Sequence, residues 1–366
     1  MAAVSEYYVD PAAGDDTNDG SIGTPWATLQ HALDNITASS HGDRINLKAG
    51  SSDVLAGNLD TTTYGSGTYL APLIIQGYTS SAGDGGQGVI DMSGTNVYAP
   101  GGTGAKIKDL RFTGCTSTST AVTIPKWGEV INCQFDDMSG TALAIYENTM
   151  VLGCRFEDID TYGVQALGAD GDHGSVIGCY FENGTKDMTA AIYSGSYSLT
   201  ACDNIINIDG STDGISLKFF GQVCNNSIFS SSGTGAGIRC NTTGESIRLW
   251  NNLIEGFSGT GGVGVEYRAD AAASINNSVY NCATAYSSDA VHLTEGNETL
   301  GATPFDKSGS ANYSNRLTYF APADVGSVRG GSYGNSTRDR GAVQSSGSGG
   351  GGASATLIPV RRPYFA

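Results

Sequence analysis

The chain has 366 residues, of which 53 are glycine and 15% are charged, and its 36 acidic against 19 basic side chains give a net charge of −17. So much glycine and so little charge exclude a coiled coil or a long-helix protein, while 39% hydrophobic residues are enough to bury a large core. The acidic balance argues against a nucleic-acid partner, because phosphate backbones attract basic surfaces. No apolar run approaches the roughly 18 residues of a membrane helix, and the first residues lack the pattern of a Sec signal peptide. We therefore expect neither a membrane partner nor Sec export.

Residues 1–42 are predicted to form an N-terminal cap that contains an amphipathic helix. Thr24 precedes Pro25, a pairing typical of a helix start, and the apolar residues that follow up to Ile36 share one face. Such a helix would cover the open end of a repeat protein.

The loop before this helix has the oxygen-bearing side chains that begin a calcium loop, at alternate positions. No glutamate stands at the twelfth position of that loop, where bidentate coordination would be expected. We therefore expect an ordinary turn. The weaker alternative is a calcium site formed by Asp15, Thr17 and Asp19, and no other cofactor is expected.

Residues 43–299 contain a repeat of 21 to 26 residues. The segments 130–135, 151–156 and 176–181 share an apolar pair, a small or polar residue, Cys, a variable residue and Phe. A second run of alternating apolar character follows in most repeats, as at 121–124, 142–145, 163–166 and 214–217. In this register one position recurs along the chain as Leu110, Cys133, Cys154, Cys179, Asn204, Asn226, Asn252 and Asn277.

Short strands at this interval cannot pair within one repeat but can stack on their equivalents, so the sequence predicts an all-β parallel β-solenoid. Equivalent side chains then form ladders with a spacing of about 4.7–4.9 Å. We predict an interior thiol ladder, from Cys133 to Cys179, that continues as an asparagine ladder from Asn204 to Asn277. A second inward row is predicted beside it, formed by Cys202, Cys224, Trp250 and Ile275. Because parallel Cβ vectors suit a disulfide poorly, all eight cysteines are predicted to be free thiols.

After residue 299 the repeat fades. We expect residues 300–344 to form a C-terminal cap, residues 345–352 to be a flexible Gly/Ser linker, and residues 353–366 to be an extended apolar and basic tail. The tail is predicted to anchor the protein to a partner, another subunit or another copy of the chain, through Leu357, Ile358, Val360, Arg361, Arg362, Tyr364 and Phe365.

The two ends of the repeat region resemble a known family. Residues 7–33 resemble the N-terminal cap, and residues 339–344 the closing strand, of the right-handed parallel β-helix proteins of the pectate-lyase-like superfamily, of the phage- or virion-associated type. The resemblance implies a right-handed, single-stranded parallel β-helix with an N-terminal capping α-helix and a C-terminal extended tail. This fold hosts lyases, glycosidases, phage tailspikes and non-catalytic virion proteins, so function has to come from a site.

Acidic residues follow the ladder phenylalanine on three successive coils, at 136–137, 157–158 and 182. Stacked carboxylates suit a glycosidase, so Asp137 and Asp158 are the candidate catalytic pair. The alternative, which we favour, is that they are solvated corner residues, because the sequence shows no aromatic sugar platform beside them.

Pectate-type lyases of this fold use a basic residue on a strand, and residues 213–218 resemble such a strand. The resemblance makes Lys218 a candidate base, with Asp203 and Asp209 nearby in the sequence. A cluster of aspartates that would bind the calcium of these lyases is not evident.

These weak catalytic constellations, the acidic rod and the anchor-like tail favour a non-catalytic structural protein. We predict a virion component, such as a head decoration, fibre or tail-associated β-helix, located at a virion or particle surface. Its partners would be other virion subunits or copies of itself, with a homo-oligomer as one arrangement. The alternative is a carbohydrate-active enzyme, either a polysaccharide lyase or a tailspike-type glycosidase, that acts on surface glycans.

Overall fold

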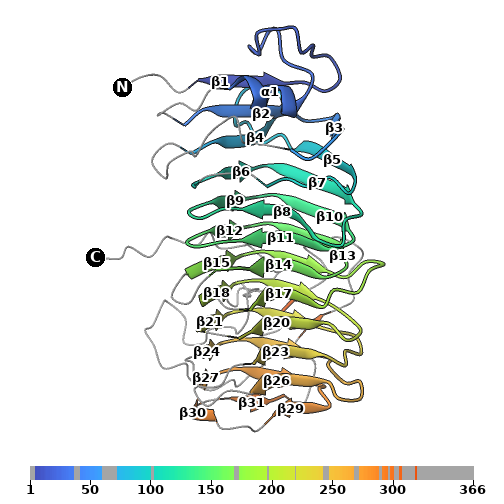
Figure 1. Ribbon diagram of the computed structural model, residues 1–366. Helices are drawn as coiled ribbons and strands as arrows, with labels where there is room; N and C mark the ends of the chain where they lie inside the picture. The colour runs from blue at the N-terminus through green and yellow to red at the C-terminus, as the bar shows by residue number, and fades with distance from the viewer. Residues whose placement is uncertain are drawn as a thin grey trace, which may run out of the picture.

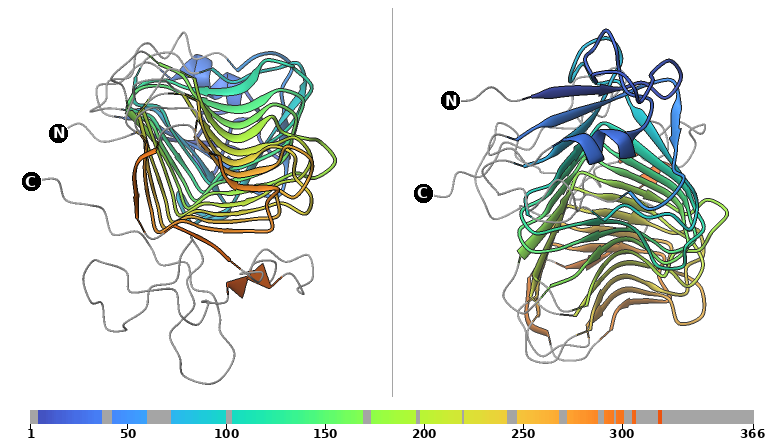
Figure 2. Two further views of the ribbon diagram at one scale, coloured as in Figure 1. Left: turned by 90° about the horizontal axis from the view of Figure 1, so that it is seen from below. Right: turned by 45° about the horizontal axis from the view of Figure 1, so that its top comes forward.

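The computed structural model describes residues 5–36, 42–59, 72–99, 103–168, 173–195, 198–218, 220–241, 247–267, 272–287, 291–295, 297–300, 305–306 and 318–319. These residues form a parallel β-solenoid, as predicted, and each central coil contributes one strand to each of three sheets (Figures 1 and 2). The sequence pattern had indicated two runs per coil. The ladder segments, such as 130–135, are instead divided between two sheets by a corner.

The first sheet has twelve strands, β1 (Glu6–Val9), β2 (Arg44–Lys48), β4 (Ile74–Tyr78), β6 (Lys106–Lys108), β9 (Glu129–Ile131), β12 (Met150–Leu152), β15 (His173–Ile177), β18 (Ser198–Cys202), β21 (Gly221–Cys224), β24 (Ile247–Trp250), β27 (Ala272–Ile275) and β30 (Val291–Glu295). The second sheet has eleven, β3 (Ser52–Val54), β5 (Gly88–Gly94), β7 (Leu110–Cys115), β10 (Gln134–Met138), β13 (Arg155–Ile159), β16 (Tyr180–Glu182), β19 (Ile205–Asn207), β22 (Ser227–Phe229), β25 (Leu253–Glu255), β28 (Ser278–Tyr280) and β31 (Glu298–Thr299).

The third sheet has eight strands, β8 (Thr120–Ile124), β11 (Thr141–Ile145), β14 (Tyr162–Ala166), β17 (Ala190–Ser194), β20 (Asp213–Leu217), β23 (Ala236–Cys240), β26 (Val263–Tyr267) and β29 (Thr284–Tyr286). A short antiparallel pair, β32 (Phe305–Asp306) and β33 (Thr318–Tyr319), follows. The predicted C-terminal cap lies mostly outside the described residues, and the linker and the anchoring tail lie entirely outside them.

Each central coil turns from the first sheet to the second in a tight corner. The residue just before the ladder position has a positive φ, a region that Gly, Asn and Asp enter most readily. This explains the run of these residue types at the corner, which consists of Asp109, Asn132, Gly153, Gly178, Asp203, Asn225, Asn251 and Asn276.

The predicted ladder is confirmed by the strand register, because the residues that follow each ladder position are paired from coil to coil. Cys154 N lies 3.4 Å from Cys179 Sγ, and Cys179 N donates to Asn204 Oδ1 at 2.9 Å. From there each asparagine Oδ1 accepts two hydrogen bonds from the preceding ladder residue, as Asn226 does from Asn204 at 2.9 and 3.0 Å. Asn297 extends the ladder by one member that the sequence pattern did not reveal.

A phenylalanine stack fills the core beside this ladder. The rings of Phe112, Phe135, Phe156 and Phe181 lie nearly parallel, with centroids 5.3, 4.9 and 4.7 Å apart, and all four are fully buried. Burial of such rings supplies much of the hydrophobic stabilisation of the coils that contain β7, β10, β13 and β16. In the same region, burial raises the pKa of the Cys154 and Cys179 thiols well above its usual value.

The prediction of eight free thiols is wrong for one pair. Cys202 and Cys224 are partners in β18 and β21 with Cα atoms 4.6 Å apart, and they form a disulfide. Adjacent parallel strands thus place equivalent cysteines inside the roughly 4.4–6.8 Å range that a disulfide requires. The row that contains them also faces outward rather than inward, because Trp250 and Ile275 are half-buried whereas the neighbouring Val223 is fully buried.

The N-terminal helix is shorter than predicted. α1 spans Leu29–Asn35 and its N-cap is Thr28, whose side chain accepts from His31 N; Thr24 and Pro25 lie before it. Asp16 explains the later start, because its carboxylate accepts from the backbone N–H of Ala27 and of Thr28 and so holds this segment extended. The predicted apolar face is buried, and no helix in the described part of the chain is long and apolar enough to cross a membrane.

Removal of one ladder amide should destabilise the fold strongly. Asn226→Ala leaves Asn204 without its acceptor and the Ala201 carbonyl without its donor, so we expect a loss of roughly 2–4 kcal/mol in the free energy of unfolding. Urea denaturation measures this loss. Asn251→Gly is the control, because glycine accepts the positive φ of that corner and should change stability by less than about 1 kcal/mol. Equal effects of the two substitutions would contradict the ladder's role.

The cysteine assignment can be checked by mass spectrometry. Alkylation of denatured, unreduced protein prepared under oxidising conditions should modify six cysteines, and prior reduction should raise this to all eight. Eight modified cysteines without reduction would refute the disulfide.

Candidate functional site

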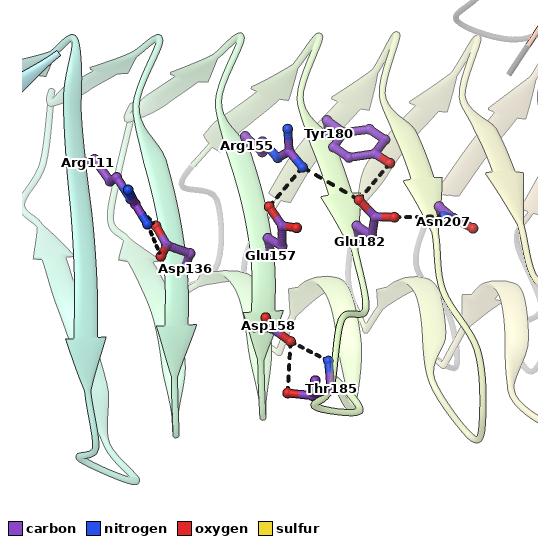
Figure 3. A network of polar contacts seen from close by, with 9 residues as sticks. All are labelled: Arg111, Asp136, Arg155, Glu157, Asp158, Tyr180, Glu182, Thr185 and Asn207. Carbon is purple, nitrogen blue, oxygen red and sulfur yellow. Dashed lines mark hydrogen bonds and ion pairs between the residues drawn. The ribbon is translucent and has the colours of Figure 1, made fainter. Parts of the chain in front are cut away.

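The outer face of the second sheet carries the acidic row that the sequence predicted. Asp136, Glu157 and Glu182 are Cα partners in β10, β13 and β16, so their stacking is confirmed (Figure 3). Guanidinium groups lie among the carboxylates. Arg111 donates to both oxygens of Asp136 at 2.8 Å, and Arg155 lies 2.8 Å from Glu157 and 3.7 Å from Glu182.

Neutral donors complete this network. Thr113 Oγ1 donates to Asp136 at 2.8 Å. Tyr180 Oη and Asn207 Nδ2 donate to Glu182 at 3.0 and 3.4 Å (Figure 3). Bidentate arginine–carboxylate pairs of this kind are strong and geometrically specific. The row therefore joins coils together and does not form a bare pair of carboxylates.

The two predicted catalytic aspartates lie on neighbouring coils but point into structural contacts. Asp137 and Asp158 both have a φ of 55°, which takes them out of the ladder pairing. Asp137 pairs with Lys186 at 2.8 Å, and Asp158 accepts from the backbone N–H and the hydroxyl of Thr185 (Figure 3). Both thus fasten the loop between β16 and β17, and their catalytic role stays a prediction.

The carboxylates of the candidate calcium loop accept hydrogen bonds from backbone N–H groups and hydroxyls of the same loop. Asp15 accepts from Thr17 N and Oγ1 at 2.8 Å, and Asp19 accepts from Ser21 N and from Thr24 Oγ1. These bonds lower the pKa of both carboxyls, chiefly through Thr17 N–H for Asp15 and the Thr24 hydroxyl for Asp19. Within the described ranges no three His, Cys, Asp or Glu side chains gather as metal ligands. Calcium here stays a prediction.

The outer face of the third sheet combines aromatic rings with charged groups. Tyr162 of β14 and Tyr193 of β17 stack with ring centroids 4.5 Å apart and an interplanar angle of 10°. Lys218 follows β20, and its Nζ lies 5.6 Å from the centre of the Tyr193 ring. The outward row through this cluster consists of Thr123, Ala144, Gln165, Tyr193, Ser216, Arg239 and Glu266.

Sequence reasoning missed this aromatic pair. Tyr162 and Tyr193 are neighbours only because β14 and β17 pair in a register that sets Gln165 opposite Tyr193. The strand β17, Ala190–Ser194, was also not among the predicted runs. The available signal was the regular interval of the third-sheet runs, which leaves one run unaccounted for between 163–166 and 214–217.

An ion triad lies on the next coils of the same face. Arg239 donates from Nε and Nη2 to the two oxygens of Asp213 at 2.7 and 2.9 Å, and its Nη1 lies 2.5 Å from Glu266. Asp213 also accepts from Ala236 N at 2.9 Å. Two carboxylates thus flank one guanidinium on the open side of β20, β23 and β26.

Lys218 is exposed and lies beside the aromatic pair, and its role as a base stays a prediction. The neighbouring Tyr193 side chain raises the pKa of this lysine. Asp203 lies at a corner between the first and second sheets, and Asp209 accepts from Ser231 N beyond the second sheet. The structure therefore does not gather these aspartates around Lys218.

The other predicted residues also lie away from Lys218. Asp137 and Asp158 precede β11 and β14, at the edge where the chain enters the third sheet. Lys218 follows β20, at the opposite edge where the chain leaves that sheet, which we call the exit edge. The alternative catalytic set of Asp137, Asp158 and Lys218 is therefore divided between two edges of one sheet.

Comparison with solved structures identifies proteins of the same architecture. A glycoside hydrolase matches over 81% of this chain and 95% of its own, with 11% identity and a TM-score of 0.60. A pectate lyase matches over 93% and 96%, with 15% identity and a TM-score of 0.54. A mannuronic acid specific polysaccharide family 6 lyase from human gut microbiota matches over 76% and 65%, with 14% identity and a TM-score of 0.56.

The protein shares its parallel β-solenoid fold with these enzymes. Identities of 11–15% establish the fold alone, and fold does not fix chemistry. No family model matches the chain, and no curated protein matches it. The pectate-lyase-like resemblance of the sequence is thus supported for the fold, and the site must carry the functional argument.

The corner aspartate gives a pH-dependent prediction. Burial raises the pKa of Asp203, with the Asn225 side chain partly opposing the shift, so the ionised form destabilises the folded state. Asp203→Asn should therefore stabilise the protein by roughly 0.5–1 kcal/mol at pH 7. The gain should vanish as the pH falls below the ordinary carboxyl range of about 4, where wild-type Asp203 is protonated in both states. Thermal unfolding of both proteins at pH 7 and pH 3 checks this, and a gain that is equal at both pH values would contradict it.

Proposed function

We propose that the protein binds a polysaccharide across the outer face of the third sheet and acts on it as a carbohydrate-active enzyme. The observation that carries the proposal is the stacked pair of Tyr162 and Tyr193 beside the Lys218 ammonium group. Aromatic faces pack against the C–H faces of sugar rings, and nearby polar groups bond to the hydroxyls. Such a mixture of flat apolar surface and a few placed polar groups is typical of ligand sites.

The polar groups around the aromatic pair fit this role. Gln165 and Ser216 lie in the same outward row as Tyr193, on either side of it. Asn241 Nδ2 donates to Oγ of the buried Ser216 at 3.1 Å, which holds the half-buried Asn241 amide at the exit edge. Amides and hydroxyls both donate and accept, as recognition of sugar hydroxyls requires.

The geometry also assigns chemical roles. In this proposal Tyr193 donates a proton to the bound sugar, because the Lys218 ammonium group, 5.6 Å from the centre of its ring, would stabilise the phenolate that remains. Lys218 would stabilise negative charge that develops on the substrate. The Asp213 and Glu266 carboxylates stand farther along the face, where Arg239 holds both in fixed positions.

The comparisons support this proposal over a purely structural role. The three solved structures described above are a glycoside hydrolase, a pectate lyase and a polysaccharide lyase, which are enzymes that act on carbohydrates. The virion prediction rests on weak catalytic constellations, the acidic rod and the linker and tail of residues 345–366, and the last two segments lie outside the described residues. A virion location, an assembly partner and a homo-oligomer therefore stay predictions.

Two substitutions test the proposed site. Tyr193→Ala and Lys218→Ala should each weaken binding to the polysaccharide that the wild type binds by at least about tenfold, or 1.4 kcal/mol, because each removes a group that contacts the sugar. Binding is measured against a panel of neutral and acidic polysaccharides. Turnover is followed by new reducing ends for hydrolysis and by ultraviolet absorbance of unsaturated products for a lyase.

Lys106→Ala is the matched control, since this lysine lies on the first sheet, where it pairs with Glu129. It should leave both binding and turnover unchanged. The proposal fails if the wild type binds no glycan, or if the two site variants bind as the wild type does.

A further inference from the structure

Trp127 is an exposed aromatic residue in an unusual backbone conformation. It lies in the turn between β8 and β9, at the same exit edge as Lys218, and 42% of its surface is exposed. Its φ is 64°, in the left-handed region that bulky residues rarely adopt. Phe220, 43% exposed, follows Lys218 at this edge, so two of the four large exposed apolar side chains among the described residues lie along it.

The turn that carries Trp127 is fixed by the coils on both sides. Gly104 N donates to the Lys126 carbonyl at 2.7 Å, and Trp127 N donates to the Glu147 carbonyl at 2.7 Å. A Cβ on Gly128 would lie 2.2 Å from Ile124 Cγ2, so only glycine fits at this position of the turn. The two backbone hydrogen bonds hold the segment that presents the ring.

The next coil shows that tryptophan is not needed to form this turn. Asn148 holds the equivalent position, with a φ of 55°, and its N–H donates to the His173 carbonyl as that of Trp127 does to Glu147. Asparagine enters this conformation more easily than an aromatic residue. A strained, exposed ring in place of a suitable asparagine points to a function for the ring.

We propose that Trp127 is a distal sugar-stacking platform, so that the ligand is a chain of several linked sugar rings that runs along the coils from Lys218 to Trp127. This inference rests on the proposed function. β8 and β20 are separated by β11, β14 and β17 in the third sheet, so the two residues are about 19 Å apart along the axis. A mono- or disaccharide does not span that distance.

The surroundings of Trp127 favour a sugar over a protein partner. Lys126, its neighbour in the chain, forms an ion pair with Glu147, so charged groups lie close to the exposed ring. Protein interfaces require a much larger area, with several apolar anchors. One flat ring next to charged hydrogen-bonding groups fits a single pyranose ring.

Trp127→Asn tests the inference with the residue that the neighbouring coil uses. Calorimetry would compare the wild type, Trp127→Asn and Tyr193→Ala with oligosaccharides of increasing length, from disaccharide to hexasaccharide, prepared from the polysaccharide that the wild type binds. Trp127→Asn should bind the shortest oligosaccharides as the wild type does and the longest at least tenfold more weakly. Its melting temperature should be unchanged or higher, and Trp127→Tyr, which retains a ring, should restore most of the long-chain affinity.

The outcomes separate the two proposals. If Trp127→Asn retains the wild-type dependence on chain length, or melts at a clearly lower temperature, the platform is refuted while the site at Tyr193 stands. If the wild type binds no oligosaccharide, both proposals are overturned. Val54→Asn, at an exposed apolar residue of β3 outside the third sheet, is the control and should leave binding of every length unchanged.

Discussion

The in-register stacking of one coil on the next is the constraint on which the rest of the structure depends. The asparagine ladder enforces it, because each amide accepts from the ladder residue above and donates to a buried carbonyl, as Asn226 does to Ala201 at 2.9 Å. A slip of one residue would reverse the two faces of every strand and bury the charged groups that now point outward. The phenylalanine stack and the corner residues with positive φ satisfy the same register, so backbone conformation, packing and hydrogen bonding agree.

The same register produces two outer faces with different chemistry. On the second sheet, the guanidinium groups of Arg111 and Arg155 lie among the stacked carboxylates, so these charges are paired within the protein. On the third sheet, the stacking places two tyrosines together, and the Lys218 ammonium group lies over the Tyr193 ring. The first arrangement stabilises the rod, whereas the second presents groups that can bind a ligand, which is why the functional proposal rests on the third sheet.

The sequence was sufficient to predict the solenoid and its ladder, because Cys133, Asn204 and their equivalents recur at a nearly constant interval in a fixed local pattern. It did not reveal the aromatic pair, since Tyr162 and Tyr193 occupy different positions of their strands and meet only through the offset between neighbouring coils. The disulfide was missed because Cys202 and Cys224 were assigned to an inward row. They lie one residue from the inward-facing position and therefore belong to the outward row. The start of α1 depends on the side chain of Asp16, a contact between separate segments that no local pattern records.

A structure of the protein in complex with an oligosaccharide would test the central claim most directly. The account predicts sugar rings on the outer face of the third sheet, stacked on Tyr193 and within hydrogen-bonding distance of the Lys218 ammonium group, with the chain extending along the exit edge toward Trp127. Sugar bound instead over the carboxylate row of the second sheet, or at a site that leaves Tyr193 and Lys218 without contact, would contradict it.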